Sequence, residues 1–231
     1  RGGLGVALAC ALVGFVVGTS TLTSLGLTLS NNIIEISGGK LFPTLVMAMV
    51  ASLVLGMGLP TTANYIVCST IIAPALIGMN VFPLAAHLFV FYFGIMADLT
   101  PPVCLAAFTG AGIAGANPAK TGFTATKIAL ASYLLPYSFI YSPMILLENV
   151  VYLDLAVILV AGVAGILGLA AGLEGWMFRP LKPLERVAII LVSVGAFLPH
   201  DLPKLVALGA VVAAFLFFRK TAGEEIQPET A

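Results

Sequence analysis

The sequence predicts an all-α polytopic membrane protein, and three observations lead to this fold class. The chain of 231 residues is 60% hydrophobic and only 9% charged, and its mean hydropathy is +1.12. A water-soluble domain usually has about a quarter of its residues charged. Uncharged runs such as 4–34, 41–97 and 155–173 recur along the chain, and a spanning helix needs about 20 apolar residues. Because the chain has few charged residues and long apolar runs, we expect the lipid bilayer to surround most of it. The formal net charge of zero argues against a nucleic-acid partner.

Polar and helix-breaking residues divide these runs. The polar break EISGGK, residues 35–40, ends the first one. Within 41–97, the stretch 56–62 and a second cluster of Gly78, Asn80 and Pro83 predict about three helical pieces. Further helices are expected at 99–119, at 128–147 and at 155–173. The last run is the cleanest single span.

The composition changes after residue 173. Residues 174–186 mix Trp and Phe with Arg and Lys, which is typical of an interfacial segment. Short apolar runs follow at 187–199 and 205–218, and the polar tail 219–231 is expected to be disordered. We therefore predict a main membrane part at 1–147, additional membrane helices at 148–218 and the tail. Basic residues lie in several loops, so the orientation in the membrane stays open.

The stretch GMGLPTTA interrupts a helix at membrane depth. Pro60 lacks an amide hydrogen, and its ring clashes with the carbonyl of Gly56, four residues earlier. Non-helical backbone in a bilayer is tolerated only within protein or beside a polar cavity. Thr61, Thr62 and Asn64 are expected to begin the next helix, whose N-terminus is weakly positive. Two interpretations remain open here: a proline kink, or a site with carbonyls for a cation and amides for an anion.

A second break is predicted at ADLTPPV, residues 97–103. Two consecutive prolines disfavour a continuous helix, so residues 82–99 and 103–115 are expected to form two helices that meet at a tip. Their short lengths favour a re-entrant hairpin over about 82–116. An ordinary turn between two spans remains open.

Asp98 lies in this second break and is the only acid between Glu35 and Glu148. An acid inside the membrane is a candidate for function, whereas at the surface it is a solvated turn residue. Both placements remain open. His87, one of only two histidines, is expected to make a contact between helices rather than to bind a metal.

Hydroxyl side chains form a third polar interruption, GTSTLTSLG at residues 18–26. Hydroxyls spaced by one helical turn can bond to the preceding carbonyls and bend the helix. They can equally line a polar path, so Thr19 and Thr21 are kept as weaker site candidates.

Broken helices whose ends converge near the bilayer midplane are typical of secondary transporters. Unwound carbonyls and hydroxyls suit sodium, a hard cation that prefers oxygen ligands, and helix N-termini suit a carboxylate. The sequence has no nucleotide-binding loop, no set of catalytic His, Ser and Asp residues and no zinc-ligand pattern. We therefore expect a transporter and not an enzyme, without a cofactor other than Na⁺ as coupling ion.

Three segments carry a resemblance to a known family: ASLVLGMGLPTTANYIV, the long stretch from APALIGMN through AAHLFVFYFGIMADLTPPV to PAKTGF, and LPYSFIYSPMILL. Together they resemble the large permease subunit of TRAP (tripartite ATP-independent periplasmic) transporters, over about residues 5–147. The segment after residue 147 resembles the extra C-terminal helices of the fused type, in which the small and large subunits form one polypeptide.

The resemblance implies a multi-pass protein of a bacterial or archaeal inner membrane that imports organic acids with a sodium gradient. Its partners would be a periplasmic substrate-binding protein, of the TAXI type in fused systems, and the rest of the permease. The implied fold is an elevator of two inverted repeats, of which this chain resembles the second. TPPV would then match the tip of a re-entrant hairpin, and GMGLPTTA the broken helix that faces it.

The same resemblance implies which residues bind sodium or line the pocket. These are Gly56, Gly58, Pro60, Thr61, Thr62, Thr100, Pro101 and Pro102. Asn64, Asp98, Thr19 and Thr21 are candidates from the residue-level argument alone. Because Arg1 opens the chain without a methionine, we expect a fragment that does not transport by itself. A non-transporting scaffold that retains the helices is the alternative.

Overall fold

The computed structural model describes residues 2–197, 209 and 211, and of residues 2–6, 9 and 10 it describes the backbone alone. The chain divides into two compact units, residues 1–129 and 130–231, rather than at the expected boundary after residue 147. The predicted apolar run 205–218, apart from residues 209 and 211, and the predicted tail 219–231 lie outside the described residues.

Most of the described residues are helical, which confirms the all-α class. The first unit contains α1 (Gly2–Leu22), α2 (Leu25–Ile36), α3 (Leu41–Gly56), α4 (Thr61–Ile71), α5 (Ala73–Gly78), α6 (Pro83–Met96), the 3₁₀ turn η1 (Ala97–Leu99), α7 (Leu105–Ala114) and α8 (Pro118–Ala129). The second contains η2 (Leu130–Leu134), α9 (Leu135–Tyr141), η3 (Pro143–Leu146), α10 (Tyr152–Glu174), β1 (Trp176–Met177), β2 (Arg179–Pro180) and α11 (Pro183–Gly195).

The hydroxyl-rich run separates α1 from α2, which meet at a bend of 66°. Thr19 and Thr21 donate their hydroxyls to the carbonyls of Phe15 and Val17, at 2.7 and 2.8 Å. Ser24 then takes up the left-handed conformation with φ 55°. The structure therefore favours the first interpretation of this run, in which the hydroxyls bend a helix.

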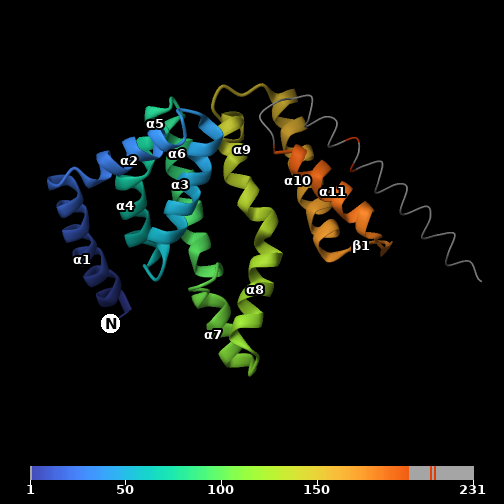
Figure 1. The fold of residues 1–231 in the computed structure, drawn as a ribbon, viewed down its shortest axis with the longest axis horizontal. Coiled ribbons are helices and arrows are strands. Elements are labelled where there is room, and N and C mark those ends of the chain that lie inside the picture. The colour runs from blue at the N-terminus through green and yellow to red at the C-terminus, as the bar shows by residue number, and fades with distance from the viewer. Residues whose placement is uncertain (1, 198–208, 210, 212–231) are drawn as a thin grey trace, which may run out of the picture. The chain divides into compact units, whose positions relative to one another are not determined.

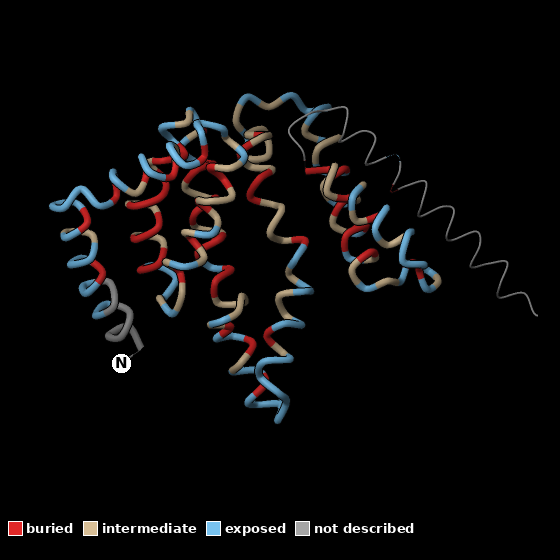
Figure 2. Tube along the Cα trace, viewed as in Figure 1, coloured by how far each residue is buried: buried red, intermediate tan, exposed pale blue. Residues whose placement is uncertain are grey.

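Helices α3, α4 and α6 pack against one another and form the core of the first unit. The predicted interruption at Pro60 is confirmed, because α3 ends at Gly56 and α4 begins at Thr61. Since the two helices are packed together and joined by only four residues, they run in opposite directions (Figure 1). Buried residues recur along all three helices (Figure 2), and Phe89 and Phe93 of α6 are fully buried.

The second predicted break is also present, but its surroundings differ from the expected hairpin over 82–116. After α6 and η1 the chain continues in the same general direction into α7 (Figure 1). Among the described elements, α7 packs mainly against α8 and η1 rather than against α6. The reversal comes after α7, at residues 115–117, where Gly115 has φ 64°. The TPPV stretch is therefore an interruption in a continuing path, and the α7–α8 pair is the hairpin.

The second unit is built around α10 and α11, which pack closely along their lengths. The predicted span 155–173 is confirmed by α10, whereas the expected helix 128–147 is divided among α8, η2, α9 and η3. A small antiparallel pairing of β1 with β2 joins α10 to α11.

By length and composition, two helical segments of the described chain can cross a membrane: Thr61–Gly78 and α10. A third is possible if the bent pair α1–α2 counts as one span. Helices α3, α6 and α7 are apolar but shorter than a span. Short apolar helices of this kind are expected where a chain enters a bilayer and turns back or is interrupted.

Candidate functional site

The connection between α3 and α4, called here the tip, consists of residues 57–60. The chain reverses direction here, and the turn uses Gly58 with φ +74°, a left-handed conformation that glycine adopts more readily than other residues. Among the described residues, the Gly56 carbonyl accepts one long bond of 3.4 Å, from the amide of Leu59. Pro60 is the N-cap of α4 and gives it no side-chain cap. The tip therefore combines a weakly bonded carbonyl with the first amides of a helix, as its sequence predicts.

The last residue of α3, Gly56, directly before the tip, lies against the end of α6 and η1. A Cβ on Gly56 would be 2.6 Å from the carbonyl oxygen of Gly94 and 3.0 Å from the Cβ of Ala97. Only hydrogen on Gly56 permits this approach. The end of α3 is thus held in backbone contact with the helix that leads into the second break.

Asn64 occupies the space between the two glycines. Its side chain is 3% exposed, and a Cβ on Gly94 would be 2.8 Å from both Oδ1 and Nδ2. The thiol of Cys68 donates to Oδ1 at 3.1 Å. The hydroxyl oxygen of Ser52 on α3 is also buried and has no partner among the described residues. Polar atoms therefore continue from the tip into the packing between α3 and α4.

The second break places a carboxylate at the end of α6. Asp98 lies in η1 and is half-buried, and its Oδ1 atom is buried without a hydrogen-bond partner among the described residues. Leaving a buried polar atom unpaired is unfavourable unless water or an ion completes the site. Asp98 is therefore not a fully solvated turn residue.

The residues that follow Asp98 are fixed by local bonds. The Thr100 hydroxyl donates to the carbonyl of Met96 at 2.6 Å, and the peptide bond between Pro101 and Pro102 is cis. Pro102 is exposed. Cys104 has the left-handed conformation, with φ 43°, and α7 begins after it.

The carbonyl oxygen of Leu99 accepts hydrogen bonds from side chains outside η1. The Thr126 hydroxyl of α8 donates to it at 2.9 Å, and the Cys104 thiol donates at 3.2 Å. The prolines that follow Leu99 have no amide hydrogen to donate, so a side chain replaces the missing helical bond. A Cβ on Gly122 would be 3.0 Å from the Cys104 sulfur, and this close approach brings α8 near enough for the bond.

The remaining candidates fall into two groups. Thr61 and Thr62 are exposed at the first turn of α4, directly beside the tip. Thr19 and Thr21 are exposed on α1, and their hydroxyls are bonded within that helix. The structure thus brings the helix ends that flank the tip against α6 and the start of the second break, through Gly56 and Asn64 on one side and Gly94 and Ala97 on the other. It offers no comparable contact for the two α1 threonines.

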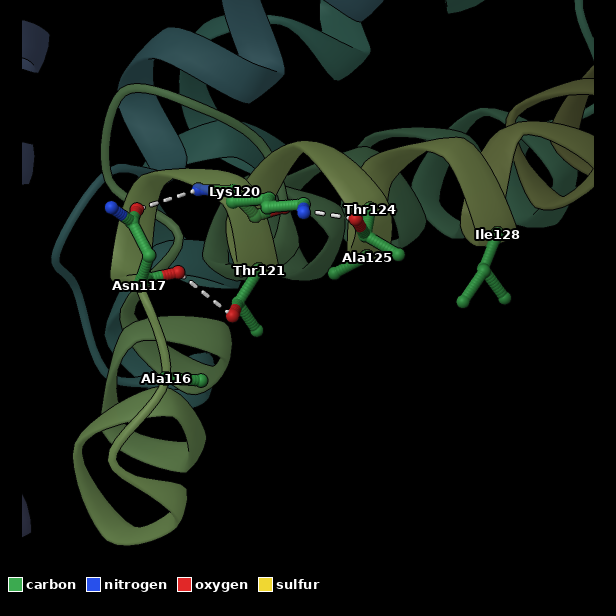
Figure 3. A pocket seen from close by; sticks show the side chains of 7 residues that line it. All are labelled: Ala116, Asn117, Lys120, Thr121, Thr124, Ala125 and Ile128. Carbon is green, nitrogen blue, oxygen red and sulfur yellow. Dashed lines mark hydrogen bonds between the residues drawn. The ribbon is translucent and has the colours of Figure 1, made fainter.

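A shallow pocket of about 360 Å³ lies on α8 and the turn before it, away from these contacts (Figure 3). Its polar groups are largely engaged locally. The hydroxyls of Thr121 and Thr124 donate to the carbonyls of Asn117 and Lys120, and the Asn117 side chain accepts from the Lys120 amide. This pocket is therefore a weaker candidate than the region between the tip and Asp98.

His87 makes the predicted interhelical contact, because its Nδ1 lies 3.1 Å from the Tyr65 hydroxyl on α4. Sequence reasoning missed two contributors to the site, Gly94 and Thr126. Gly94 is a lone glycine in an apolar helix, and its four-residue distance from Asp98 is the one available signal. Thr126 is 27 residues from its acceptor, and only packing reveals such a pair.

Comparison with known proteins gives one positive result. A family model described as "Tripartite ATP-independent periplasmic transporter, DctM component" matches residues 2–153, more than half of the chain. No curated protein and no solved structure matches.

Proposed function

Because the chain belongs to this family of transporter permeases, we propose that it forms part of a sodium-coupled importer of organic acids. A periplasmic substrate-binding protein, of the TAXI type in this proposal, delivers the acid. The remaining parts are the other repeat and the small-subunit helices of a fused permease in a bacterial or archaeal inner membrane. In this proposal residues 1–147 form one repeat, the second, of an elevator-type fold, and the helices after residue 147 are additional membrane helices.

One observation supports the proposal most strongly: α4, which follows the tip, and α6, which leads into the second break at Asp98, are in direct contact through Asn64 and Gly94. Two interrupted helices that meet in an apolar protein form the usual construction of a secondary transporter site. Irregular backbone at membrane depth otherwise carries a large desolvation cost. The wall formed by Gly56, Asp98 and Thr100 is our proposed sodium-binding region.

The donor set fits sodium. The buried Oδ1 atom of Asp98 supplies an oxygen without another partner among the described groups. Among the described residues, the Gly56 carbonyl has only its 3.4 Å bond from Leu59 to compete with a cation. Carboxylate, carbonyl and hydroxyl oxygens are the ligands preferred by hard cations. In this proposal Asp98 also offsets the charge of the bound ion.

The substrate carboxylate is assigned to the N-terminus of α4. Thr61 and Thr62 are exposed there, and the helix has no side-chain cap. Free amides and the positive end of the helix dipole favour an anion. In this proposal Gly58, Pro60, Pro101 and Pro102 belong to the same region, where they set the backbone of the two helix breaks.

A non-transporting scaffold is the second candidate function. The packed α10–α11 helix pair is consistent with a scaffold, which needs stable helix packing in the membrane but no binding site. A scaffold has no need for an unpartnered carboxylate oxygen beside two helix breaks. The sodium dependence of transport therefore distinguishes the two.

The test uses the complete transporter, reconstituted with its binding protein and supplied with a labelled organic acid. In Asp98→Asn we expect the sodium concentration for half-maximal uptake to rise at least about tenfold, the loss of about 1.4 kcal/mol of sodium binding. Thr100→Ala and Thr62→Ala are measured beside it. Asp154→Asn, an exposed acid in the first turn of α10, is the matched control. An unchanged sodium requirement in all three site variants would exclude the assigned site, and uptake without a sodium gradient would exclude sodium coupling.

A further inference from the structure

We propose that the turn between α10 and α11 is a membrane-interface anchor that rests on the phospholipid headgroups of the cytoplasmic leaflet. This anchor turn comprises residues 174–184. The proposal concerns the placement of the second unit in the membrane. It stands independently of sodium coupling and of the site between the tip and Asp98.

The length of α10 places the anchor turn at a membrane surface. Its 23 residues extend about 34 Å at 1.5 Å per residue, close to the hydrocarbon thickness of about 30 Å. The helix ends at Glu174, and its C-cap residue Gly175 has φ +79°. Arg186 donates from Nε and Nη2 to the carbonyls of Gly172 and Leu173, at 3.1 and 2.9 Å. A guanidinium fixed at this end of the helix belongs at headgroup level rather than in the hydrocarbon.

Large apolar side chains of the anchor turn point outward. Trp176 is 58% exposed, Phe178 42% and Leu184 82%. Aromatic rings are enriched at membrane–water interfaces, where the ring is apolar and its surroundings are polar. Met177 and Leu181 point the other way and pack with Ile189 of α11, which holds the turn against the helix pair. The packing of Met177 and Leu181 thus holds the turn in place while Trp176, Phe178 and Leu184 remain exposed.

Polar contacts stiffen the same turn. Arg179 forms a double ion pair with Glu185, with Nη2–Oε1 at 2.7 Å and Nη1–Oε2 at 3.2 Å. Glu185 also accepts from the backbone amide of Lys182 at 2.8 Å. Both carboxylate oxygens are therefore engaged, and the Lys182 side chain is exposed. These contacts orient the apolar face while a cation remains available to headgroup phosphates.

The distribution of basic residues selects the side. Arg179, Lys182 and Arg186 follow α10 within 12 residues, whereas residues 130–151 before it contain no Lys or Arg. Loops rich in Lys and Arg close to a span stay on the cytoplasmic side. The sequence alone left the orientation open because basic residues lie in several loops along the chain. Because the basic residues close to α10 lie only after its C-terminal end, we assign that end to the cytoplasm and the Tyr152 end to the periplasm.

The first experiment measures depth with Trp176, the only tryptophan of the chain. The chain is reconstituted in phosphatidylcholine vesicles, with or without phosphatidylglycerol, that contain lipids brominated near the headgroup or near the tail end. We expect stronger quenching by the shallow bromines than by the deep ones, and a further increase with phosphatidylglycerol. Lys182→Gln should lose that increase and keep the shallow profile. Quenching by aqueous iodide without quenching by brominated lipid, or stronger quenching by the deep bromines, would overturn the proposal.

The second experiment measures the side of the membrane with a membrane-impermeant maleimide. Lys182→Cys and Val151→Cys are each introduced into a chain whose three native cysteines are alanine. Lys182→Cys should react only in inside-out vesicles, and Val151→Cys only in intact spheroplasts. The opposite pattern, or reaction of both from the same side, would overturn the orientation. Failure of Lys182→Cys to react from either side would contradict its placement among headgroups.

Discussion

The side-chain amide of Asn64 lies directly against the backbone of Gly94, where a Cβ would be 2.8 Å from both of its polar atoms. Asn64 is one turn into α4, and Gly94 lies in the last turns of α6, four residues before Asp98. The contact therefore links the helix that follows the tip to the helix that enters the second break. It fixes the position of one interrupted helix relative to the other.

Replacing Gly94 with alanine should force these helices apart. A methyl group at a full contact is overpacking, which costs about 1–3 kcal/mol, so we expect a lower thermal unfolding midpoint for Gly94→Ala. The midpoint is measured in detergent with a thiol-reactive dye that reports exposure of the buried Cys68 and Cys104, in a Cys10→Ala background. Gly110→Ala is the control, because a Cβ there has no atom within 4 Å. Equal losses in both variants would contradict the prediction.

Truncating the amide should partly rescue this clash. Asn64→Ala alone removes the acceptor of the Cys68 thiol and should destabilise the chain. The double variant Asn64→Ala/Gly94→Ala should be more stable than the sum of the single effects predicts, by about 0.5–3 kcal/mol, the usual coupling of residues in contact. The measurement is a double-mutant cycle of unfolding free energies under the same conditions. Strict additivity would show that the contact does not govern the energetics.

Thr126→Val should destabilise the second break. The substitution keeps the shape and removes the hydroxyl that donates to the Leu99 carbonyl, a bond worth about 0.5–1.5 kcal/mol. Thr124→Val is the matched control, because its hydroxyl bonds within α8 to the Lys120 carbonyl. We expect faster hydrogen exchange around residues 99–104 in the Thr126 variant alone. The same change in both variants, or in neither, would argue against this role.

Acid should loosen the anchor turn through Glu185. Hydrogen bonds from Arg179, then from the Lys182 amide, lower the pKa of this carboxyl below its ordinary value of 4.5. A depressed folded-state pKa adds stability that is present above the ordinary pKa and is lost as pH falls through the folded-state value. The Trp176 emission of the reconstituted chain should therefore change below about pH 4.5.

The control for this titration is Glu185→Gln, which has no carboxylate to protonate at this position. Its Trp176 emission should lack the acid transition. An identical transition in both chains would assign the effect to another acid, with Glu174 the nearest in sequence.

Local chain chemistry made several features predictable. Pro60, with Gly56 and Gly58 before it, cannot continue a helix, and the double proline at 101–102 interrupts the next one; both breaks are present. The uncharged run 155–173 predicted α10 for the same reason: composition over about 20 residues decides whether a helix suits a bilayer. These features depend on residues close together in the sequence.

Which break reverses the chain was not predictable in the same way. The resemblance placed a hairpin tip at TPPV and a broken helix at GMGLPTTA, and the structure exchanges these roles. Both stretches end a helix. The residues around each break do not determine whether the next helix packs against the preceding one. After the tip, α4 packs against α3 and α6, whereas after the second break α7 packs against α8.

The sequence by itself determined that this chain is helical and apolar, where its helices break, and to which family it belongs. Those properties follow from the hydropathy of short segments and from proline and glycine backbone chemistry. Only the tertiary structure decided that Asn64 meets Gly94, that Thr126 bonds to Leu99, and that an Asp98 oxygen is left without a partner among the described residues. Such pairings depend on side-chain volume and helix approach between segments that are distant in the chain, and packing sets both.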